Sequence, residues 1–593
     1  MRIRRPGSGN HLKQNVKCRC DPSRRGHSPP ATVTQNERSG MTDDAYAPRV
    51  EGHRFVVGPN INPTRTEWHF DKRGFRCFTH RPKRFDDLLR FAARDTPQNE
   101  ALVCGDSRLN YAQFDEQVTR IANGLSDEGI EAGERVGVML GNGIPFFLAI
   151  MGAVRLGAIA VPMSVKMSPP ETAHILNQCA AAALITEAAV MDRLPVMTEC
   201  PSVRKTWLSG PDIMGQMMTP FKSLLDAPAT PRRPTGLEDD TILLFYTSGT
   251  TGKPKGASIA NINILHSALH FAYGLDLKAG QRSLLAIPGA HISGFMAVFT
   301  NMLGVAGTTV LMREYKTTAV LKLMKRERIT FTVFVPSIYQ LILMHDDFTA
   351  ADFDAWRTGI YGGGIMPPVH VARLAVALPK LRLINAYGAT ETTSPVSIMP
   401  AWASLDRPKS VGLLVECADA LIMDDNGVEM PRGEIGELWV RGPMVAKGYW
   451  NAPEQTAENF INGFWRTGDL VSMNEDGYLF IHDRKKDMIN RAGYKVFSAE
   501  VENVMLAQEG VLECAAVPVP DPVIGERVCL FVTICDSVAD EVTLRAYAAE
   551  NLSDYKQPDY YKISTDALPR NANGKVVKSQ LVRVANEIEK LRK

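Results

Sequence analysis

The fold of this chain is constrained most by a regular alternation of apolar strands and helices that begins near residue 84. Arg135-Val-Gly-Val-Met-Leu140 has the continuous apolar character of a buried strand, residues 144–156 predict an apolar helix, and Ala158-Ile-Ala-Val161 predicts the next strand. The same pattern predicts a helix from about residue 170, a strand at 183–186, a helix at 318–328, a strand at 329–335 and a helix at 337–344. Such alternation with short links predicts parallel sheets covered by helices, with ligands at the carboxyl ends of strands.

A second constraint is the loop Tyr246-Thr-Ser-Gly-Thr-Thr-Gly-Lys-Pro-Lys-Gly256, which directly follows the apolar run Ile242-Leu-Leu-Phe245. Glycines let backbone N–H groups approach an anion closely, and hydroxyl and ammonium groups complete the surface. The loop predicts a polyphosphate site. It is not a Walker loop, because only two residues separate Gly249 from Gly252 and Pro254 follows the lysine. The phosphate-binding candidates are Thr247, Ser248, Gly249, Thr250, Thr251, Gly252, Lys253 and Lys255.

The length and composition of the chain indicate a multidomain globular protein. A length of 593 residues exceeds what one hydrophobic core usually supports. The ten cysteines are scattered without zinc-like pairs, which favours reduced thiols in a cytoplasmic enzyme. The longest apolar stretch, residues 144–154, is too short for a transmembrane segment.

The first forty residues differ from the rest of the chain. They hold nine Lys/Arg and two Asp/Glu and are rich in Pro, Gly and Ser, so we expect residues 1–40 to be a disordered basic leader. A nucleic-acid arm or an organelle transit peptide would have such a charge. The leader lacks a sustained amphipathic helix and an apolar signal core. We therefore expect that translation begins at Met41, and we expect no nucleic-acid partner.

Two glycine-containing segments follow later strands. Three glycines in Tyr361-Gly-Gly-Gly364 permit close approach to a flat ligand such as a purine, or form a tight turn. Asn385-Ala-Tyr-Gly-Ala-Thr-Glu391 follows the apolar strand 381–384 and offers an aromatic face, a hydroxyl and a carboxylate. A carboxylate near phosphates is a natural Mg²⁺ ligand.

Three further segments are ambiguous by themselves. In Trp465-Arg-Thr-Gly-Asp469 the aspartate either caps a turn or binds ribose hydroxyls. Asp483-Arg-Lys-Lys-Asp487 is a charged run between apolar strands at 478–481 and 488–489, and such runs are usually solvated surface. Pro569-Arg-Asn-Ala-Asn-Gly-Lys575 presents one lysine on a turn-rich loop.

Together these segments resemble the adenylate-forming family of acyl-CoA synthetases, nonribosomal-peptide adenylation domains and firefly-type luciferases. The resemblance covers about residues 85–590, and the motifs follow one another in the family's order. It implies an α/β fold with a large N-terminal AMP-binding domain (41–483) of helix-covered β-sheets plus a distorted β-barrel subdomain. A hinge (484–487) would lead to a small, mobile α+β C-terminal lid domain (488–593).

The resemblance also implies roles for single residues. The loop 246–256 would order the phosphates of ATP, and Lys575 would bridge the acyl carboxylate and the α-phosphate. Gly362, Gly363, Gly364 and Tyr387 would hold adenine, Thr390 the α-phosphate, Glu391 Mg²⁺, and Asp469 and Arg484 the ribose. His291 would lie beside the acyl pocket, although a histidine in an apolar stretch is also a common core residue. Gly388 would favour an acid larger than acetate, Lys486 would be the hinge, and Gly493 would line the CoA tunnel.

The implied activity is an ATP-dependent carboxylic acid–CoA ligase that forms an acyl-adenylate and releases pyrophosphate and AMP. The expected substrates are a carboxylic acid (medium- or long-chain fatty or aromatic), ATP and CoA, with Mg²⁺ as cofactor. The alternatives are an adenylating enzyme that loads a carrier protein and a catalytically inactive relative. A homodimer is compatible with the resemblance.

Overall fold

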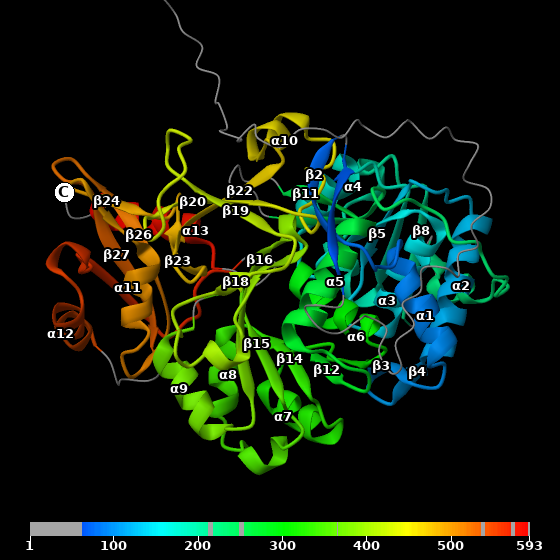
Figure 1. Ribbon diagram of the computed structural model, residues 1–593, viewed down its shortest axis with the longest axis horizontal. Helices are drawn as coiled ribbons and strands as arrows, with labels where there is room; N and C mark the ends of the chain where they lie inside the picture. Colours follow the sequence, from blue (N-terminus) through cyan, green and yellow to red (C-terminus); the bar gives the residue numbers. More distant parts are fainter. Residues whose placement is uncertain are drawn as a thin grey trace, which may run out of the picture. The chain divides into compact units, whose positions relative to one another are not determined.

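We describe the protein from a computed structural model, which places residues 62–70, 72–210, 218–247, 254–364, 366–534, 540–570 and 576–590. Within these ranges, no helix combines the length and apolar character needed to cross a membrane. Figure 1 shows strands in several sheets with helices packed beside them.

In the described chain, seven strands form one sheet in the order β11-β10-β6-β5-β7-β8-β9. Its strands are β5 (Arg135–Met139), β6 (Ile159–Pro162), β7 (Ala183–Glu187), β8 (Lys205–Ser209), β9 (Thr219–Pro220), β10 (Thr241–Thr247) and β11 (Lys255–Ala260). The pairs from β10 to β9 are parallel, whereas β11 pairs antiparallel with β10 at the edge. Phosphate-loop residues 248–253 lie outside the described residues.

Helices α3 (Ile144–Leu156) and α4 (Pro169–Gln178) connect strands of this sheet. Both helices have proline in their first turn, where a missing N–H removes no intrahelical hydrogen bond. Helix α3 ends at Gly157, which takes the left-handed conformation (φ 88°) of a helix C-terminus. Residues 146–156 of α3 are all buried, which explains its apolar composition on every face.

A second, larger sheet joins parallel and antiparallel halves. Its strands are β3 (Glu100–Cys104), β4 (Ser107–Asn110), β12 (Arg282–Leu285), β13 (Thr308–Leu311), β14 (Phe331–Phe334), β15 (Thr358–Tyr361), β16 (Arg382–Ala389), β17 (Ser394–Ile398), β18 (Gly412–Leu414), β19 (Asp419–Met423), β20 (Gly436–Arg441), β21 (Phe460–Ile461), β22 (Phe464–Met473) and β23 (Tyr478–Arg484). Strand β16 is parallel to β15 over residues 382–385 and antiparallel to β17 over residues 386–389. It therefore links a helix-covered parallel sheet to a curled antiparallel one.

Further helices cover this region. They are α1 (Phe85–Asp95), α2 (Tyr111–Asp127), α5 (Asn261–Leu275), α6 (Asn301–Gly304), α7 (Thr317–Arg326), α8 (Pro336–Leu343), α9 (Pro368–Ala377) and α10 (Pro453–Asn459). Figure 1 shows α7, α8 and α9 beside strands β14 and β15. A separate hairpin is formed by β1 (Thr64–His69) and β2 (Arg73–Phe78).

The C-terminal part has its own sheet and its own core. The sheet comprises β24 (Ile489–Arg491), β25 (Tyr494–Val496), β26 (Val511–Asp521), β27 (Gly525–Ile534) and β28 (Tyr560–Ser564), with helices α11 (Ser498–Met505), α12 (Glu541–Asn551) and α13 (Lys578–Lys590). Alternate residues of β26 enter two different apolar clusters, because successive side chains of a strand point to opposite faces.

The structure confirms the expected α/β fold class and most of the predicted elements. The helix predicted at 144–156 matches α3, and the strands predicted at 135–140 and 158–161 match β5 and β6 within one residue at either end. One difference concerns β16, which continues through Ala389 instead of ending at 384. The extension depends on antiparallel pairing with β17, which local sequence does not reveal.

Candidate active site

The candidate site is built on the second half of β16. A β-bulge lies between Tyr387 and Gly388, where the register with β17 shifts. Bulges re-aim side chains and are common beside active sites. Beyond the strand, Ala389 leads into a short 3-10 turn of Thr390–Thr392, whose residues are buried. The strand and this turn together hold Tyr387, Thr390 and Glu391, which were singled out from the sequence.

Tyr387, Asp469 and Arg484 come together across three strands. The Tyr387 hydroxyl donates a hydrogen bond to Asp469 Oδ2 (2.5 Å), and Arg484 Nε lies 3.1 Å from Asp469 Oδ1. Asp469 on β22 and Arg484 on β23 are direct partners in the antiparallel register. Burial, with the neighbouring Asp469 carboxylate, raises the pKa of Tyr387 well above its usual value, so this hydroxyl remains a donor.

Glu391 is a buried carboxylate with few partners. Its side chain accepts a hydrogen bond from the Tyr449 hydroxyl (2.9 Å from Oε1), and its carbonyl accepts one from Ala446 N (2.7 Å). In the part of the chain that the structure describes, its second carboxylate oxygen has no hydrogen-bond partner. Lys255 Nζ lies 5.3 Å from the centroid of the Tyr449 ring. Tyr449 thus connects the end of the phosphate loop to Glu391.

The ends of the phosphate loop are also defined. Thr247 is the last residue of β10 and pairs with Lys255, the first residue of β11. The loop therefore connects two antiparallel strands, whereas a Walker loop connects a strand to a helix. This difference in topology agrees with the difference in spacing.

Gly362 and Gly388 are required by the backbone around them. A Cβ added to Gly362 would lie 2.4 Å from Ala386 O, and one added to Gly388 would lie 1.3 Å from Ser394 O. Gly363 has φ +71° with no atom near its Cβ position, and the nearest atoms to a Cβ on Gly364 belong to Pro336 at 3.7 Å. Close strand packing therefore accounts for Gly388 by itself, and its size alone does not support an acid larger than acetate.

His291 is half-buried beside a π-helix. Its Nδ1 hydrogen bonds to Ser293 Oγ (2.5 Å), and Ser293–Thr300 form a π-helix whose other residues are buried. A Cβ on Gly294 would lie 2.2 Å from Pro288 O, so the chain before the π-helix is tightly folded. π-Helical turns occur frequently at functional sites. The sequence pattern gave no sign of this element.

Three further residues were predicted from the sequence: Lys486, Gly493 and Lys575. Lys486 is exposed in the turn between β23 and β24, where Asp487 N and Met488 N donate to Arg484 O (2.9 and 3.1 Å). Gly493 is exposed, with φ +86° and open space at its Cβ position. Lys575 lies outside the described residues.

Sequence reasoning missed two functional candidates. Tyr449 holds Glu391, and its only sequence signal is an aromatic residue after glycine in Lys447-Gly-Tyr-Trp450. Asp483 was read as part of a charged run, but it is buried and accepts from Ser498 Oγ (3.0 Å) and from Ser498 N at the first residue of α11. Asp483 therefore provides a hydrogen-bond acceptor for the first backbone N–H of α11.

Comparison with known proteins agrees with this geometry. Residues 89–450 match the family described as AMP-binding enzyme, and residues 500–575 match the AMP-binding enzyme C-terminal domain. Feruloyl-CoA synthase of an Amycolatopsis species is 32% identical over 494 residues, covering 83% of this chain and 97% of that protein. The long-chain-fatty-acid–CoA ligase FadD13 of Mycobacterium tuberculosis (strain CDC 1551 / Oshkosh) is 31% identical over 500 residues, covering 83% and 97%.

Two further relatives bear on the acceptor and on the nucleotide. The fatty acid–[acyl-carrier-protein] ligase ScoC of Streptomyces coeruleorubidus is 31% identical over 508 residues, covering 83% of this chain and 94% of that protein. The structure of o-succinylbenzoate coenzyme A synthetase from Bacillus subtilis, in complex with ATP and a magnesium ion, has a TM-score of 0.74 at 26% identity and covers 84% of this chain and 99% of that one. This chain belongs to the AMP-binding enzyme family and is an AMP-forming acid–CoA ligase that works through an acyl-adenylate.

Proposed function

We propose that the end of β16 is the adenylate site of this ligase. The observation that carries the proposal is the convergence of Tyr387, Asp469 and Arg484 at one point of the fold. In this arrangement the Tyr387 ring packs on adenine, with the backbone of Gly362–Gly364 beside it, and Asp469 and Arg484 bind the ribose hydroxyls. Each Asp469 oxygen has one partner in the described chain and a second lone pair for a ribose hydroxyl.

Glu391 is suited to be a ligand of a magnesium ion. Among the residues that the structure describes, the Glu391 carboxylate is 8% exposed and has one hydrogen-bond partner, the Tyr449 hydroxyl. Burying such a carboxylate is costly, and a cation would offset that cost. When bound, Mg²⁺ would supply positive charge to the phosphate oxygens of ATP. Tyr449 would fix the orientation of the Glu391 carboxylate, and Thr390 would donate to the α-phosphate.

We assign the first chemical step to the acid carboxylate. One of its oxygens attacks the α-phosphorus of ATP, and the bond to the β-phosphate oxygen breaks to release pyrophosphate. Both reactants are anionic, so positioned cations lower the barrier. Lys575 would bridge the two reacting groups, while residues 247–255 would hold the departing phosphates. In the second step a CoA thiolate attacks the acyl carbonyl, AMP leaves, and a thioester forms.

The two steps place different demands on the same carbonyl. Lys575 would lie there in the first step, and the thiol must reach it in the second. We propose that residues 484–487 act as a hinge, with Lys486 absorbing the rotation, between a large domain (41–483) and a lid domain (488–593). Gly493 would then line the pantetheine path. Hinges commonly consist of a few residues at the ends of elements.

The acid is proposed to carry an aromatic or long-chain apolar body. This class follows the names of the relatives, which act on ferulate and on long-chain fatty acids. His291, at the start of the buried π-helix, is the proposed wall of the acyl pocket. The cysteines that the structure describes are free thiols, which supports a reducing, cytoplasmic setting. A homodimer remains a prediction.

A panel of acids tests the proposed substrate. Purified full-length protein is incubated with ATP, Mg²⁺ and labelled pyrophosphate, together with acetate, hexanoate, palmitate, ferulate or benzoate. We expect exchange with at least one aromatic or long-chain acid and little with acetate. Preferential exchange with acetate would contradict the substrate class. Adding CoA or an acyl-carrier protein to the active mixture then identifies the acceptor, and AMP release that depends on the carrier alone would contradict CoA as acceptor.

A further inference from the structure

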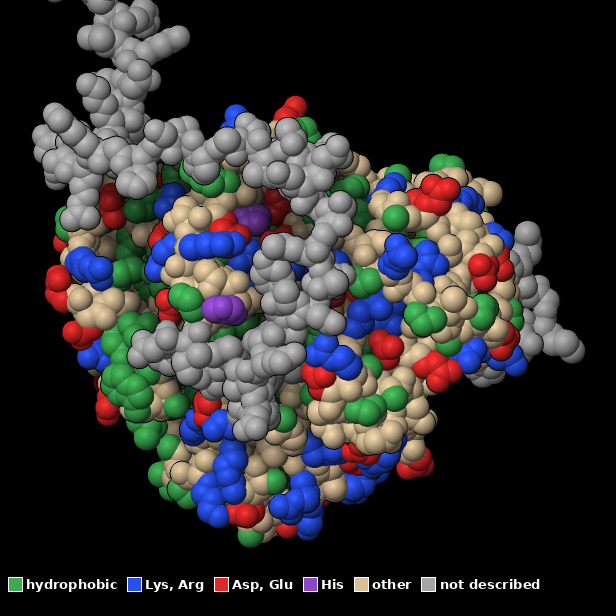
Figure 2. Space-filling view, turned by 45° about the vertical axis from the view of Figure 1, so that its right-hand side comes forward, with side chains coloured by type: hydrophobic (Ala, Val, Ile, Leu, Met, Phe, Trp, Pro, Cys, Tyr) green, Lys and Arg blue, Asp and Glu red, His purple; other side chains and the backbone are tan. Residues whose placement is uncertain are grey.

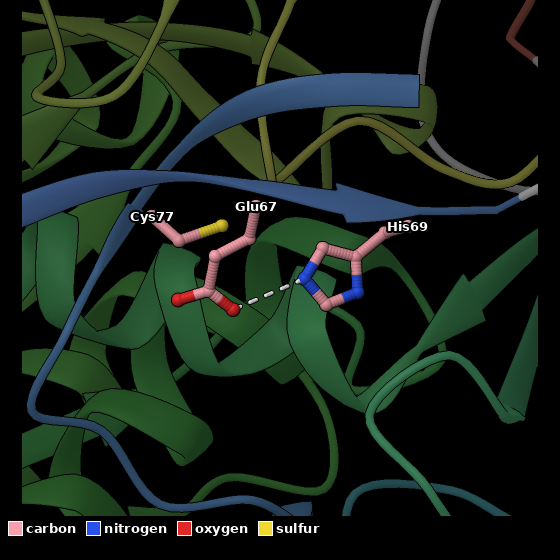
Figure 3. Close-up of side chains that lie close together, drawn as sticks. All are labelled: Glu67, His69 and Cys77. Atoms are coloured by element: carbon pink, nitrogen blue, oxygen red, sulfur yellow. Dashed lines mark ion pairs between the residues drawn. The ribbon is translucent and has the colours of Figure 1, made fainter. Parts of the chain in front are cut away.

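The hairpin of β1 and β2 carries three side chains with metal-binding atoms on one face. Glu67 and His69 are two residues apart on β1, so they point to the same side. Cys77 on β2 pairs with Arg65, which places its side chain on that side as well. The ligand atoms of Glu67, His69 and Cys77 all lie within 4.8 Å of one another, and Figure 3 shows them converging. We call these three residues the hairpin cluster.

His69 is oriented by a carboxylate outside the cluster. Its Nδ1 lies 2.5 Å from Asp239 Oδ1, and because a carboxylate only accepts, the imidazole donates through Nδ1. This orientation turns the second ring nitrogen, Nε2, toward Glu67. This atom is buried without a hydrogen-bond partner in the described chain, and it lies 3.4 Å from Glu67 Oε2. A carboxylate–histidine pair with the other nitrogen free is the arrangement found around metal-bound histidines.

His69 Nε2 and the Glu67 carboxylate face each other across 3.4 Å, a position that favours a proton or a metal ion between them. The Glu67 carboxylate forms ion pairs with Arg81 and Arg65. These arginines donate to Oε1 at 3.0 and 2.9 Å, and Arg81 also donates to Oε2 at 2.7 Å. Each carboxylate oxygen has two lone pairs, so Oε2 retains one toward His69.

The charges around the hairpin cluster are balanced before a metal binds. Glu67 forms ion pairs with Arg65 and Arg81, and Glu238 forms ion pairs with Arg81 and Lys83. Asp239 contacts His69, so three carboxylates stand beside three cations. Cys77 is fully buried. A divalent ion that displaces the thiol proton to solvent therefore adds only one net positive charge.

We propose that Glu67, His69 and Cys77 bind a divalent transition-metal ion, zinc in the first place, with Asp239 as the outer hydrogen-bond partner of His69. Nitrogen, sulfur and carboxylate oxygen are the zinc ligands of proteins, and a water would complete a tetrahedron. Zinc–ligand bonds of about 2.0–2.3 Å bring ligand atoms to within about 4 Å of one another, so the cluster would tighten by small side-chain movements. The Cys77 S–H bond breaks, its proton passes to solvent, and a zinc–thiolate bond forms.

The proposed site would fix the hairpin against the segment that precedes β10. Asp239 lies two residues before β10, and Phe70 N also donates to its carboxylate (3.1 Å). From the same hairpin, Arg73 donates to Ala446 O (3.2 Å) and Lys447 O (2.7 Å), close in sequence to Tyr449. The metal is therefore expected to stabilise the fold and to have no part in the AMP-forming chemistry.

The test is metal binding by the full-length protein. Protein is stripped with a chelator, returned to Mg²⁺-containing buffer, titrated with zinc and measured by elemental analysis after gel filtration. We expect one zinc per chain in the wild type and in Cys417→Ser, a matched control because Cys417 is also fully buried and affects the pKa of Cys77. Cys77→Ser and His69→Gln should lose the ion, and Asp239→Asn should weaken binding about 10- to 100-fold.

Spectroscopic measurements distinguish loss of a metal ligand from loss of folding in the variants. Cobalt substituted for zinc should give a thiolate-to-metal charge-transfer band in the wild type and in C417S that is absent in C77S. Circular dichroism and acid-dependent AMP formation identify which variants remain folded. Wild-type protein that takes up no zinc, or equal binding by C77S, would overturn the proposal. The first result would assign a proton, and not a metal, to the space between His69 and Glu67.

Discussion

At the scale of single residues, the site depends on polar groups that hold one another in place. Asp469 is 4% exposed and is stabilised by Tyr387 and Arg484, while Glu391 depends on Tyr449. Hydrogen bonds to charged groups are worth roughly 1.5–3 kcal/mol net. In the proposed adenylate site, these contacts would position the groups before the nucleotide arrives, so less ordering would be required when it binds.

Substitution of Tyr387 separates the role of its ring from that of its hydroxyl. Tyr387→Ala should raise the KM for ATP about tenfold or more, because base stacking contributes about 1–3 kcal/mol. Tyr387→Phe keeps the ring and removes only the hydrogen bond to Asp469, so the KM for ATP should change by about threefold or less. Pyrophosphate exchange at varied ATP concentration measures both values. Similar KM values for the two variants would argue against stacking on adenine.

Substitution of Glu391 tests its assignment to Mg²⁺. Glu391→Gln should lower the exchange rate by roughly a hundredfold and raise the Mg²⁺ concentration for half-maximal rate. Glu437→Gln is a matched control, since Glu437 is also buried (5% exposed) but is paired with Arg466 and Lys485. The rate is measured against Mg²⁺ at saturating ATP. An unchanged Mg²⁺ requirement in E391Q would remove Glu391 from the metal site.

At the scale of elements, the site arises where β16 changes from parallel to antiparallel pairing. The helix at 144–156 and the strands near 135 and 158 could be predicted, because apolar composition and Pro/Gly boundaries are local signals. The second half of β16 could not, because its partner β17 is reached only after the Thr390–Thr392 turn. The contact of Tyr449 with Glu391 joins residues 58 apart in sequence, so it could not be predicted from local sequence either.

The bulge in β16 predicts different costs for two glycine substitutions. Gly388→Ala would place Cβ 1.3 Å from Ser394 O, so we expect a loss of about 3 kcal/mol or more in the free energy of unfolding. In Gly363→Ala the added Cβ would meet no other atom. Only the left-handed backbone conformation is unfavourable for alanine, and we expect it to lower the free energy of unfolding by about 1 kcal/mol. Urea unfolding measures both. Equal losses of unfolding free energy in the two variants would mean that the backbone at the bulge moves easily to accommodate the added methyl group.

The turn between β26 and β27 predicts a pH-dependent contribution to stability. Backbone N–H groups of Ile524 and Val523, together with Arg527, lower the pKa of Asp521 from 3.8 to about 2. Because the pKa of Asp521 is lower in the folded than in the unfolded protein, its ionised carboxylate stabilises the fold when the pH is above 3.8. This contribution is lost as the pH falls from 3.8 toward 2 and the carboxylate becomes protonated. Asp521→Asn should therefore be less stable than wild type at pH 7, with a difference that shrinks below pH 3.8. Urea midpoints from pH 7 to pH 3 measure the difference, and one that grows on acidification would contradict the assignment.

At the scale of the whole molecule, the C-terminal part has its own sheet and its own apolar clusters, which suits the proposed rotation of the lid domain. The chain reaches the C-terminal sheet through the turn at residues 485–487, in which Lys486 is exposed. The motif order was sufficient to predict the fold class and the ligase activity. The acid could not be predicted, because the walls of its pocket come from segments whose packing is set by tertiary contacts, as at Gly388.

Substitution of Lys575 separates the two half-reactions. Lys575→Ala should slow pyrophosphate exchange by about a hundredfold or more, because a cation at the reacting oxygens is lost. Thioester formation from supplied acyl-AMP and CoA should change little. Lys562→Ala, an exposed lysine on β28, serves as the control and should leave both rates unchanged. Equal loss of both half-reactions in K575A would contradict the rotation of the lid domain.

The acyl-adenylate is tested most directly by following the oxygen of the acid. An acid that supports exchange is labelled with ¹⁸O in its carboxylate and converted with ATP and CoA, and the products are analysed by mass spectrometry. Attack of the carboxylate on the α-phosphorus predicts one labelled oxygen in AMP and none in pyrophosphate. Label in inorganic phosphate, with ADP as the nucleotide product, would contradict the account.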